Sequence, residues 1–185
     1  EYNPMEYVNT NIIGGKNLID SALHNKVDKV ITLSTDKAAN PINLYGASKL
    51  ASDKIFVAAK NVVGTGDPLF AIVRYGNVIG SRGSVVPFFS DLIERKIDSL
   101  PITDPRMTRF WITVRQGAHC VLRTAAHMQG GELVIPKIPS IKITDLASAI
   151  GGELKHKVIG IRPGEKLHEV LMAEEEAWYA LELDD

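Results

Sequence analysis

The amino-acid sequence predicts an α/β protein with a doubly wound parallel sheet and a smaller α/β portion after residue 75. Residues 28–34 and 69–74 are short runs of apolar and β-branched residues, which is typical of strands buried on both faces. Segments with helical periodicity precede and separate these two strands. An alternation of helix and strand with buried strands favours a parallel sheet covered by helices on both faces.

Each element follows from a local pattern. Residues 9–25 repeat apolar positions at helical spacing, which predicts an amphipathic helix before the first strand. A second helix is expected from about 43 to 62, opening near Pro41 and Asn43. After residue 75 the pattern loosens into a glycine-rich loop, followed by a helix that starts at 85–89 and by further short helices and strands.

Composition excludes several classes of protein. A net charge of −1 over 185 residues offers no field for nucleic acid or for an anionic membrane. No apolar run approaches the roughly 18–20 residues that span a bilayer. The single cysteine, Cys120, excludes an internal disulfide and fits a reducing cytoplasm, and its apolar helical surroundings favour packing over catalysis. A cytoplasmic protein without nucleic-acid or membrane partners is expected.

The two ends of the sequence predict a piece of a longer protein. The chain starts without methionine and leads at once into a helix, and it stops without a helix-ending signal. The glycine-rich phosphate loop of a dinucleotide fold is absent, and such a loop would lie upstream of every element seen here. We expect it within roughly a hundred further residues that precede this chain.

The most informative residues follow the first predicted strand. Tyr45 and Lys49 stand four positions apart, so a helix places both on one face, and a nearby cation is expected to lower the tyrosine pKa. Tyr45 is then a candidate general base for a sugar hydroxyl. Asp36 and Lys37 would provide a second acid–base pair at the strand end, where open α/β sheets bind ligands. A tyrosine and a lysine at this spacing also occur by chance in many helices. The alternative interpretation is a tyrosine that faces solvent and lies over the aliphatic part of the lysine side chain.

The sequence resembles the extended short-chain dehydrogenases/reductases and, within them, the inverting UDP-N-acetylglucosamine 4,6-dehydratases. Membrane-associated relatives usually carry methionine where Tyr45 stands, and glucose-type dehydratases carry Asp-Glu where this chain has Asp36 and Lys37. The stretches that carry the resemblance run through nearly the whole chain: residues 34–38, 40–49, 74–89, 102–112 and 161–169.

The resemblance implies a Rossmann-like fold and a lyase. Residues 1–75 are expected to form the C-terminal part of the NAD(P)-binding domain, and residues 76–185 mainly a UDP-sugar-binding portion from which some segments return to it. NADP is the expected cofactor, with NAD possible. The family acts in the biosynthesis of pseudaminic acid, a sugar used in the glycosylation of flagellin. The expected catalytic residues are Thr35, Asp36, Lys37, Tyr45 and Lys49. The expected cofactor-binding residues are Leu33, Ser34, Thr35, Tyr45, Lys49 and Val78.

Substrate-binding residues are expected in two later segments. Glycine-rich backbone, a guanidinium and a helix start after residue 80 can hold a diphosphate, although a surface loop explains the same composition. Arg162 and Glu165 lie in a rigid turn, and the resemblance assigns them to the diphosphate and the uridine ribose; a surface ion pair is the alternative. Either Arg106 or Arg109 is a further phosphate candidate. The full expected set is Asn77, Arg82, Gly83, Ser84, Val85, Val86, Pro87, Arg162 and Glu165.

Other chemistry has little support. The five histidines show no metal-ligand spacing with cysteine or carboxylates, so no metal is expected. No serine-hydrolase elbow is present.

Two rival functions remain open at this point. A nucleotide-sugar 4-epimerase would need Tyr45 and Lys49 but not the Asp36–Lys37 couple, and a non-catalytic UDP-sugar-binding protein would need neither pair for turnover. A homo-oligomer is also expected, because in the wider family the helix that carries Tyr45 packs in a dimer. The apolar residues that fit such a contact, or equally a core, are Leu50, Ile55, Phe56 and Val57.

Overall fold

A computed structural model describes residues 3–64, 66 and 68–183. The chain divides into two compact units. Unit 1 comprises residues 1–74, 124–135 and 170–185, and unit 2 comprises residues 75–123 and 136–169. The predicted α/β class with a parallel sheet is confirmed. The binding roles that we assigned to residues 1–75 and 76–185 stay a prediction.

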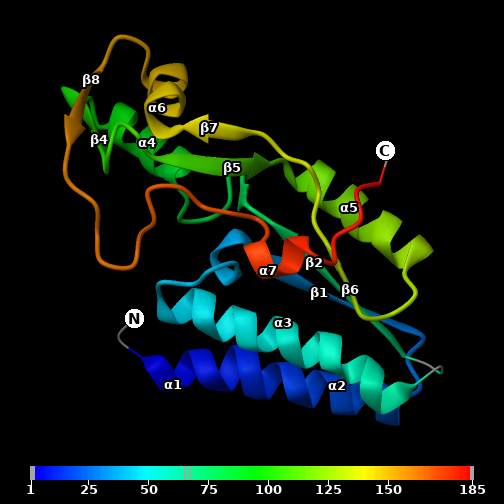
Figure 1. The fold of residues 1–185 in the computed structure, drawn as a ribbon. Coiled ribbons are helices and arrows are strands. Elements are labelled where there is room, and N and C mark those ends of the chain that lie inside the picture. Colours follow the sequence, from blue (N-terminus) through cyan, green and yellow to red (C-terminus); the bar gives the residue numbers. More distant parts are fainter. Residues whose placement is uncertain (1–2, 65, 67, 184–185) are drawn as a thin grey trace. The chain divides into compact units, whose positions relative to one another are not determined.

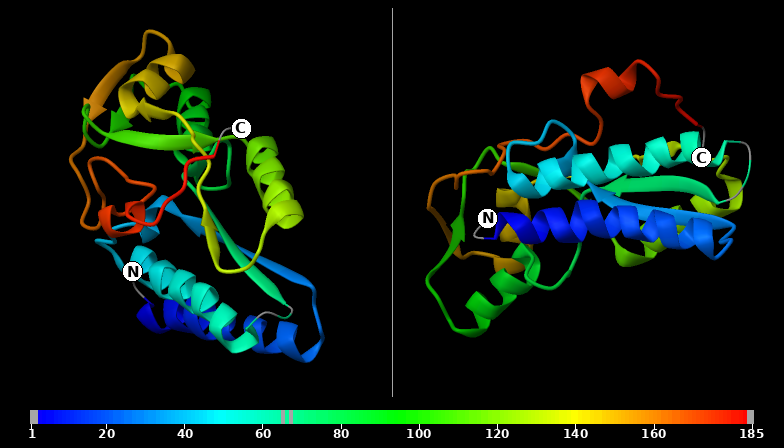
Figure 2. Two further views of the ribbon diagram at one scale, coloured as in Figure 1. Left: turned by 45° about the vertical axis from the view of Figure 1, so that its right-hand side comes forward. Right: turned by 90° about the horizontal axis from the view of Figure 1, so that it is seen from below.

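Unit 1 contains the four elements that the sequence predicts. The first helix is a continuous rod made of α1 (Pro4–Tyr7), a π-helical segment η1 (Val8–Ile13) and α2 (Gly14–His24). It packs along the long helix α3 (Leu44–Val63), and Figures 1 and 2 show the two side by side. The predicted strands are β1 (Lys29–Thr35) and β2 (Leu69–Tyr75).

The sheet of unit 1 has the strand order β1-β2-β6. Strand β6 (Glu132–Val134) pairs with β2 in parallel, with Ala71 opposite Glu132 and Val73 opposite Val134. Five of the seven β2 residues are buried, as a continuous apolar run predicts for a strand covered on both faces.

The core of unit 1 joins the helices to the central strand. Its buried members are Ile19, Ala22, Phe56, Ala59, Phe70 and Ile72. Phe56 of α3 meets Phe70 of β2 edge to face, with ring centroids 6.1 Å apart. Because Phe56 is buried here and Ile55 packs against this core, core packing accounts for two of the four apolar residues considered for a dimer contact; Val57 is 39% exposed.

Unit 2 is built from short elements around a second core. Helices α4 (Val85–Glu94) and α6 (Ile143–Gly151) pack against each other over buried residues that include Phe89, Leu100 and Ala147. Strands β3 (Asn77–Val78), β5 (Thr108–Ile112) and β7 (Ser140–Lys142) form one sheet, and helix α5 (Val114–His127) follows β5.

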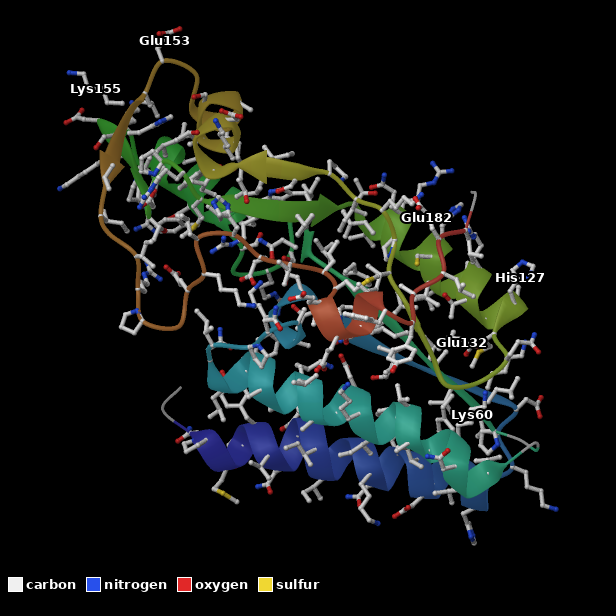
Figure 3. The ribbon with its side chains drawn as sticks, viewed as in Figure 1. Lys60, His127, Glu132, Glu153, Lys155 and Glu182 are labelled. Atoms are coloured by element: carbon white, nitrogen blue, oxygen red, sulfur yellow. The ribbon has the colours of Figure 1, made fainter. Side chains whose placement is uncertain are left out.

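A two-stranded parallel sheet completes unit 2. It pairs β4 (Ser99–Ile102) with β8 (Lys155–Val158), and Leu100 lies opposite His156. Glu153, between α6 and β8, and Lys155, the first residue of β8, extend outward from the ribbon in Figure 3. Charged side chains on such a strand are a common protection against unwanted pairing.

Within the described residues, no helix is long and apolar enough to cross a membrane. The same residues contain no group of three or more histidine, cysteine and carboxylate side chains arranged to hold a metal ion.

Candidate active site

The candidate site lies where β1 of unit 1 ends. Thr35, the last residue of β1, is followed by a short 3₁₀ turn, η2 (Asp36–Ala38), which packs against the first turn of α3. The Thr35 hydroxyl accepts a hydrogen bond from the Lys37 amide at 3.3 Å and so caps this turn. The strand therefore delivers its polar residues to the carboxyl edge of the sheet, where open α/β folds bind ligands.

Asp36 and Lys37 form an ion pair at this edge. Lys37 Nζ lies 3.0 Å from Asp36 Oδ1, and the Thr35 hydroxyl donates to the same oxygen at 3.0 Å. The Asp36 side chain is completely buried, whereas that of Lys37 is 27% exposed. In the part of the chain that the structure describes, Asp36 Oδ2 has no hydrogen-bond partner. A buried carboxylate with one unused oxygen is a strong acceptor, or a donor once protonated.

Gly46 allows α3 to approach this turn closely. A Cβ atom at position 46 would lie 2.1 Å from the carbonyl oxygen of Lys37 and 3.0 Å from Cβ of Pro41. Only glycine fits between α3 and η2 at this separation. The helix begins here with Asn43 as N-cap, whose side chain accepts from the Gly46 amide at 2.7 Å.

Tyr45 joins the same constellation through Thr35. The Tyr45 side chain hydrogen-bonds the Thr35 side chain and is 37% exposed. Its ring centroid is 6.2 Å from that of Tyr7, and α1 and η1 both pack on α3. The structure thus brings together Thr35, Asp36, Lys37 and Tyr45, as the sequence predicts.

The expected effect of Lys49 on Tyr45 is wrong. Burial raises the pKa of Tyr45; its hydrogen bond with Thr35 works in the opposite direction, and the charges of Asp36 and Asp53 raise the pKa further. The Lys49 ammonium group donates to the Leu33 carbonyl oxygen at 2.7 Å. Burial lowers the pKa of Lys49, and the charge of Asp53 opposes that shift.

The predicted cofactor residues of unit 1 surround the end of β1. Leu33 is 46% exposed, whereas Ser34 is buried and its hydroxyl donates to Asp53 Oδ2 at 2.6 Å. The Ser34 hydroxyl is therefore engaged inside the protein. Val78, the remaining predicted cofactor residue, belongs to unit 2, where it pairs with Ile112.

The predicted substrate residues belong to unit 2. Asn77 lies opposite Trp111 in β3, and Gly83, with φ of +76°, precedes the N-cap Ser84 of α4. The Ser84 hydroxyl is buried and has no hydrogen-bond partner within the described residues. The expected helix start is confirmed, with Val85, Val86 and Pro87 in its first turn and Arg82 exposed just before it.

Arg162 and Glu165 are linked through backbone hydrogen bonds of their turn, and their expected contacts with the diphosphate and the ribose stay a prediction. Glu165 Oε2 accepts from the backbone amide of Arg162 at 3.1 Å, and the Glu165 amide donates to the Arg162 carbonyl at 3.1 Å. Of the two other arginine candidates, Arg106 binds Asp104 through two nitrogen atoms, and Arg109 donates to the carbonyls of Thr108 and Leu167.

Sequence reasoning missed the group that lies behind the site. Asp53 of α3, Arg74 of β2 and Glu176 of α7 (Glu174–Ala177) form a buried network with Ser34. Asp53 stands four residues after Lys49, so the helical spacing that drew attention to Tyr45 and Lys49 extends to it. The partner Glu176, 102 residues from Arg74, has no comparable local signal.

Comparison with known proteins identifies related sequences along the whole chain. The family model described as polysaccharide biosynthesis protein matches residues 1–185. A UDP-N-acetylglucosamine 4,6-dehydratase (inverting) from Campylobacter jejuni is 57% identical over 185 residues, which are 100% of this chain and 55% of that protein. A UDP-glucose 4-epimerase from Rickettsia felis is 42% identical over 180 residues, which are 95% of this chain and 52% of that protein.

A solved structure is similar over the same extent. The X-ray structure of Pen from Bacillus thuringiensis has a TM-score of 0.93 and 39% identity, and the match covers 100% of this chain and 60% of that one. The chain thus spans about half the length of the curated relatives that it matches.

Proposed function

Because the chain belongs to the polysaccharide biosynthesis protein family, we propose that it carries the catalytic residues of an inverting UDP-N-acetylglucosamine 4,6-dehydratase. The observation that carries this proposal is the buried Asp36–Lys37 ion pair, joined through Thr35 to Tyr45. Removal of water from a sugar needs an acid and a base in addition to the group that accepts the hydroxyl proton. A 4-epimerase has no step for this extra couple.

The residues present fit a nicotinamide cofactor. Lys49 and Tyr45 share one face of α3, and the Leu33 carbonyl uses one of the three donors of the Lys49 ammonium group. The other donors suit ribose hydroxyls, and the exposed Leu33 side chain at the strand end suits the face of a flat ring. When bound, such a cofactor supplies an acceptor for hydride from C4 of the sugar and a donor of hydride to C6.

The residues of the chain move the protons. Tyr45 accepts the proton of the sugar O4 hydroxyl, and Thr35 holds the phenol group in place. The resulting 4-ketone acidifies the proton at C5, which Lys37 removes. Asp36 gives a proton to the departing C6 hydroxyl, which leaves as water. Return of a proton to the opposite face of C5 inverts that carbon.

The ion pair itself provides the protonation states for this sequence. Transfer of one proton across the 3.0 Å between Lys37 Nζ and Asp36 Oδ1 converts ammonium and carboxylate into amine and carboxylic acid. Lys37 then acts as base and Asp36 as acid without any further group.

We also propose that unit 2 binds the UDP-sugar through the segments around Asn77, residues 82–87, Arg162 and Glu165. Support comes from the buried, unpartnered Ser84 hydroxyl at the start of α4 and from the free amides of that helix end, both of which suit a diphosphate. NADP is the expected cofactor, with NAD as the alternative, and titration of the full-length protein with each would decide between them.

Cytoplasmic location and a homo-oligomer complete the proposal. The single cysteine and the charge of −1 support the location. Cell fractionation and light scattering of the full-length protein would test these two points.

The decisive experiment uses the full-length protein with UDP-N-acetylglucosamine and nicotinamide cofactor in D₂O, followed by NMR. We expect a 4-keto-6-deoxy sugar with deuterium at an inverted C5. Appearance of the C4 epimer without loss of water would instead identify an epimerase, and bound but unchanged sugar would identify a binding protein.

A matched pair of variants tests the role of Lys37. Lys37→Met should abolish both deuterium incorporation at C5 and water loss, because no amine remains to accept the proton. Lys54→Met removes a lysine of α3 whose side chain is 60% exposed, and this variant should retain activity. Normal water release by Lys37→Met would overturn the assignment of the base.

A further inference from the structure

Arg74 occupies the centre of unit 1 and is completely buried. Its Nη2 donates to Asp53 Oδ2 at 3.1 Å and to Glu176 Oε1 at 3.0 Å. Its Nη1 donates to Glu176 Oε2 at 2.7 Å and to the Leu171 carbonyl at 3.1 Å. One guanidinium group therefore joins the central strand, α3 and the segment that leads into α7.

Asp53 connects this network to the catalytic end of the sheet. Its Oδ2 accepts from Ser34 at 2.6 Å and from Arg74, so α3 is tied to β1 one residue before Thr35. Its Oδ1 is buried without a hydrogen-bond partner among the described residues. Since residues four apart lie on one face of a helix, Tyr45, Lys49 and Asp53 form a single stripe along α3.

The charges of the network balance locally. Burial raises the pKa of Asp53, while hydrogen bonds from Ser34 and Arg74 and the charges of Arg74 and Lys49 oppose that effect. Burial would likewise raise the pKa of Glu176, but the hydrogen bonds from Arg74 and the Ala173 amide outweigh it and lower the pKa. The pKa of Asp53 is raised overall, and its hydrogen bonds to β1 and β2 offset part of the effect of burial.

Several polar and charged groups lie near Tyr45, and Thr35, Asp36, Tyr7 and Asp53 influence its pKa. Tyr7 approaches from α1, Thr35 and Asp36 from the end of β1, with Lys37 paired to Asp36, and Lys49 and Asp53 follow on α3 itself. Of the two nearby carboxylates, Asp36 already has a role in the proposed chemistry. The charge of Asp53 also raises the pKa of Tyr45, but Asp53 has no role in the proposed reaction.

We propose that Asp53 is a positioning residue for the reaction: held by hydrogen bonds from Ser34 and Arg74, it fixes α3 against the end of β1 and places a carboxyl group one helical turn beyond Lys49. This inference rests on the proposed function for the identity of the reaction. The hydrogen bonds of Asp53 with Ser34 and Arg74 are features of the structure. Glu176 holds the other side of Arg74, so the segment 170–176 completes the network.

The charge can be removed without removing the hydrogen bonds. In Asp53→Asn, the amide oxygen still accepts from Ser34 and Arg74 while the negative charge is lost. We expect the midpoint of Tyr45 ionisation to fall in Asp53→Asn, because loss of a nearby negative charge makes the phenolate easier to form.

Two readouts of the full-length protein measure this shift. The first is NMR titration of tyrosine labelled at Cζ, with Tyr45 assigned through Tyr45→Phe. The second is the rise of kcat/KM for UDP-N-acetylglucosamine with pH, which should move to lower pH in Asp53→Asn. The matched control is Asp20→Asn on α2, where the carboxylate is 55% exposed and pairs with Lys16, and it should leave both midpoints unchanged.

A second variant tests the network separately. Arg74→Lys keeps the positive charge but cannot reach both carboxylates and the Leu171 carbonyl, because lysine lacks the planar fork of arginine. We expect the Tyr45 midpoint to stay near that of the wild type while kcat falls about 10-fold with little change in KM. A lower Tm with unchanged kcat would show that the network serves stability alone and would overturn the positioning role.

The outcomes separate the two proposals. If the wild-type protein does not convert UDP-N-acetylglucosamine, the proposed function fails, but the NMR titration still tests the effect of Asp53. If the midpoint of Tyr45 ionisation is the same in Asp53→Asn as in Asp20→Asn, the charge of Asp53 does not influence Tyr45. The inference then fails, whatever the activity of the enzyme. If Asp53→Asn does not fold, Arg74→Lys decides through kcat.

Discussion

Replacement of Gly46 with alanine would force α3 and the turn η2, which carries the proposed catalytic residues Asp36 and Lys37, apart. The added Cβ would lie 2.1 Å from the Lys37 carbonyl oxygen and 3.0 Å from the Lys37 carbonyl carbon. Both obstacles are backbone atoms, so no side chain can rotate away to relieve the clash. The helix start or the turn that carries Asp36 and Lys37 has to move.

The magnitude follows from this geometry. An ordinary contact between a methyl carbon and an oxygen is about 3.3 Å, so the two segments must separate by roughly 1 Å. Overpacking of this kind costs about 1–3 kcal/mol, and loss of the hydrogen bond from the Gly46 amide to Asn43 would add about 1 kcal/mol. A displacement of about 1 Å at a reacting group lowers a rate by a factor of about 100.

Urea unfolding and turnover of the full-length protein measure the two effects. We expect Gly46→Ala to lose about 2–4 kcal/mol of unfolding free energy and about two orders of magnitude in kcat. Gly117→Ala is the matched control: Gly117 lies in helix α5, a Cβ there meets Tyr75 at an ordinary 3.9 Å, and the change should be neutral or stabilising by up to about 1 kcal/mol. A Gly46→Ala protein with the stability and kcat of the wild type would refute the close approach.

Three further predictions concern the same unit. Tyr45→Phe should lower kcat at least about 100-fold. The wild-type rate should keep rising on the alkaline side of neutral pH, because burial raises the pKa of the group that must lose its proton, the hydrogen bond with Thr35 opposes this effect, and the charges of Asp36 and Asp53 raise the pKa further. The pKa of Glu176 is lowered in the folded protein, so its carboxylate stabilises the fold above the ordinary value of 4.5. This stabilisation is lost as the pH falls through the lower pKa of the folded state. Thermal unfolding should therefore show that Glu176→Gln loses less stability than the wild type between about pH 5 and 3. Phe56→Ala, which empties a site only 3% exposed, should cost about 3–5 kcal/mol in urea unfolding.

Local pattern was sufficient to predict the elements that carry the site. The strand expected at 28–34 is β1, Lys29–Thr35, and the helix expected at about 43–62 is α3, Leu44–Val63. Buried parallel strands are continuous apolar runs, and a long helix repeats its apolar face, so both are visible in one sequence. The π-helical segment at Val8–Ile13 was predicted only as helix, since one extra residue in a turn leaves no clear signature in a short apolar repeat.

The ionisation of Tyr45 could not be predicted from its spacing to Lys49. Helical spacing fixes which side chains share a face, but not where a long lysine chain directs its ammonium group. The Leu33 carbonyl, at the end of β1, takes that group at 2.7 Å. Burial of the Tyr45 phenol and the charges of Asp36 and Asp53 then raise its pKa. Neither the depth of the phenol nor its proximity to Asp53 can be predicted without the fold.

Buried charge explains why the remaining part of the site has to be assembled from distant segments. A buried guanidinium group is stable only if carboxylates or other acceptors reach it, and the sequence neighbours of Arg74 carry no carboxylate. Its partners come from 21 residues upstream and from 97 and 102 residues downstream. Leu171 and Glu176 stand in no recognisable sequence pattern. Without them, Arg74 would keep only Asp53 as a hydrogen-bond partner. The segment that contains Leu171 and Glu176 is therefore part of the framework that holds α3 and β2 of unit 1 together.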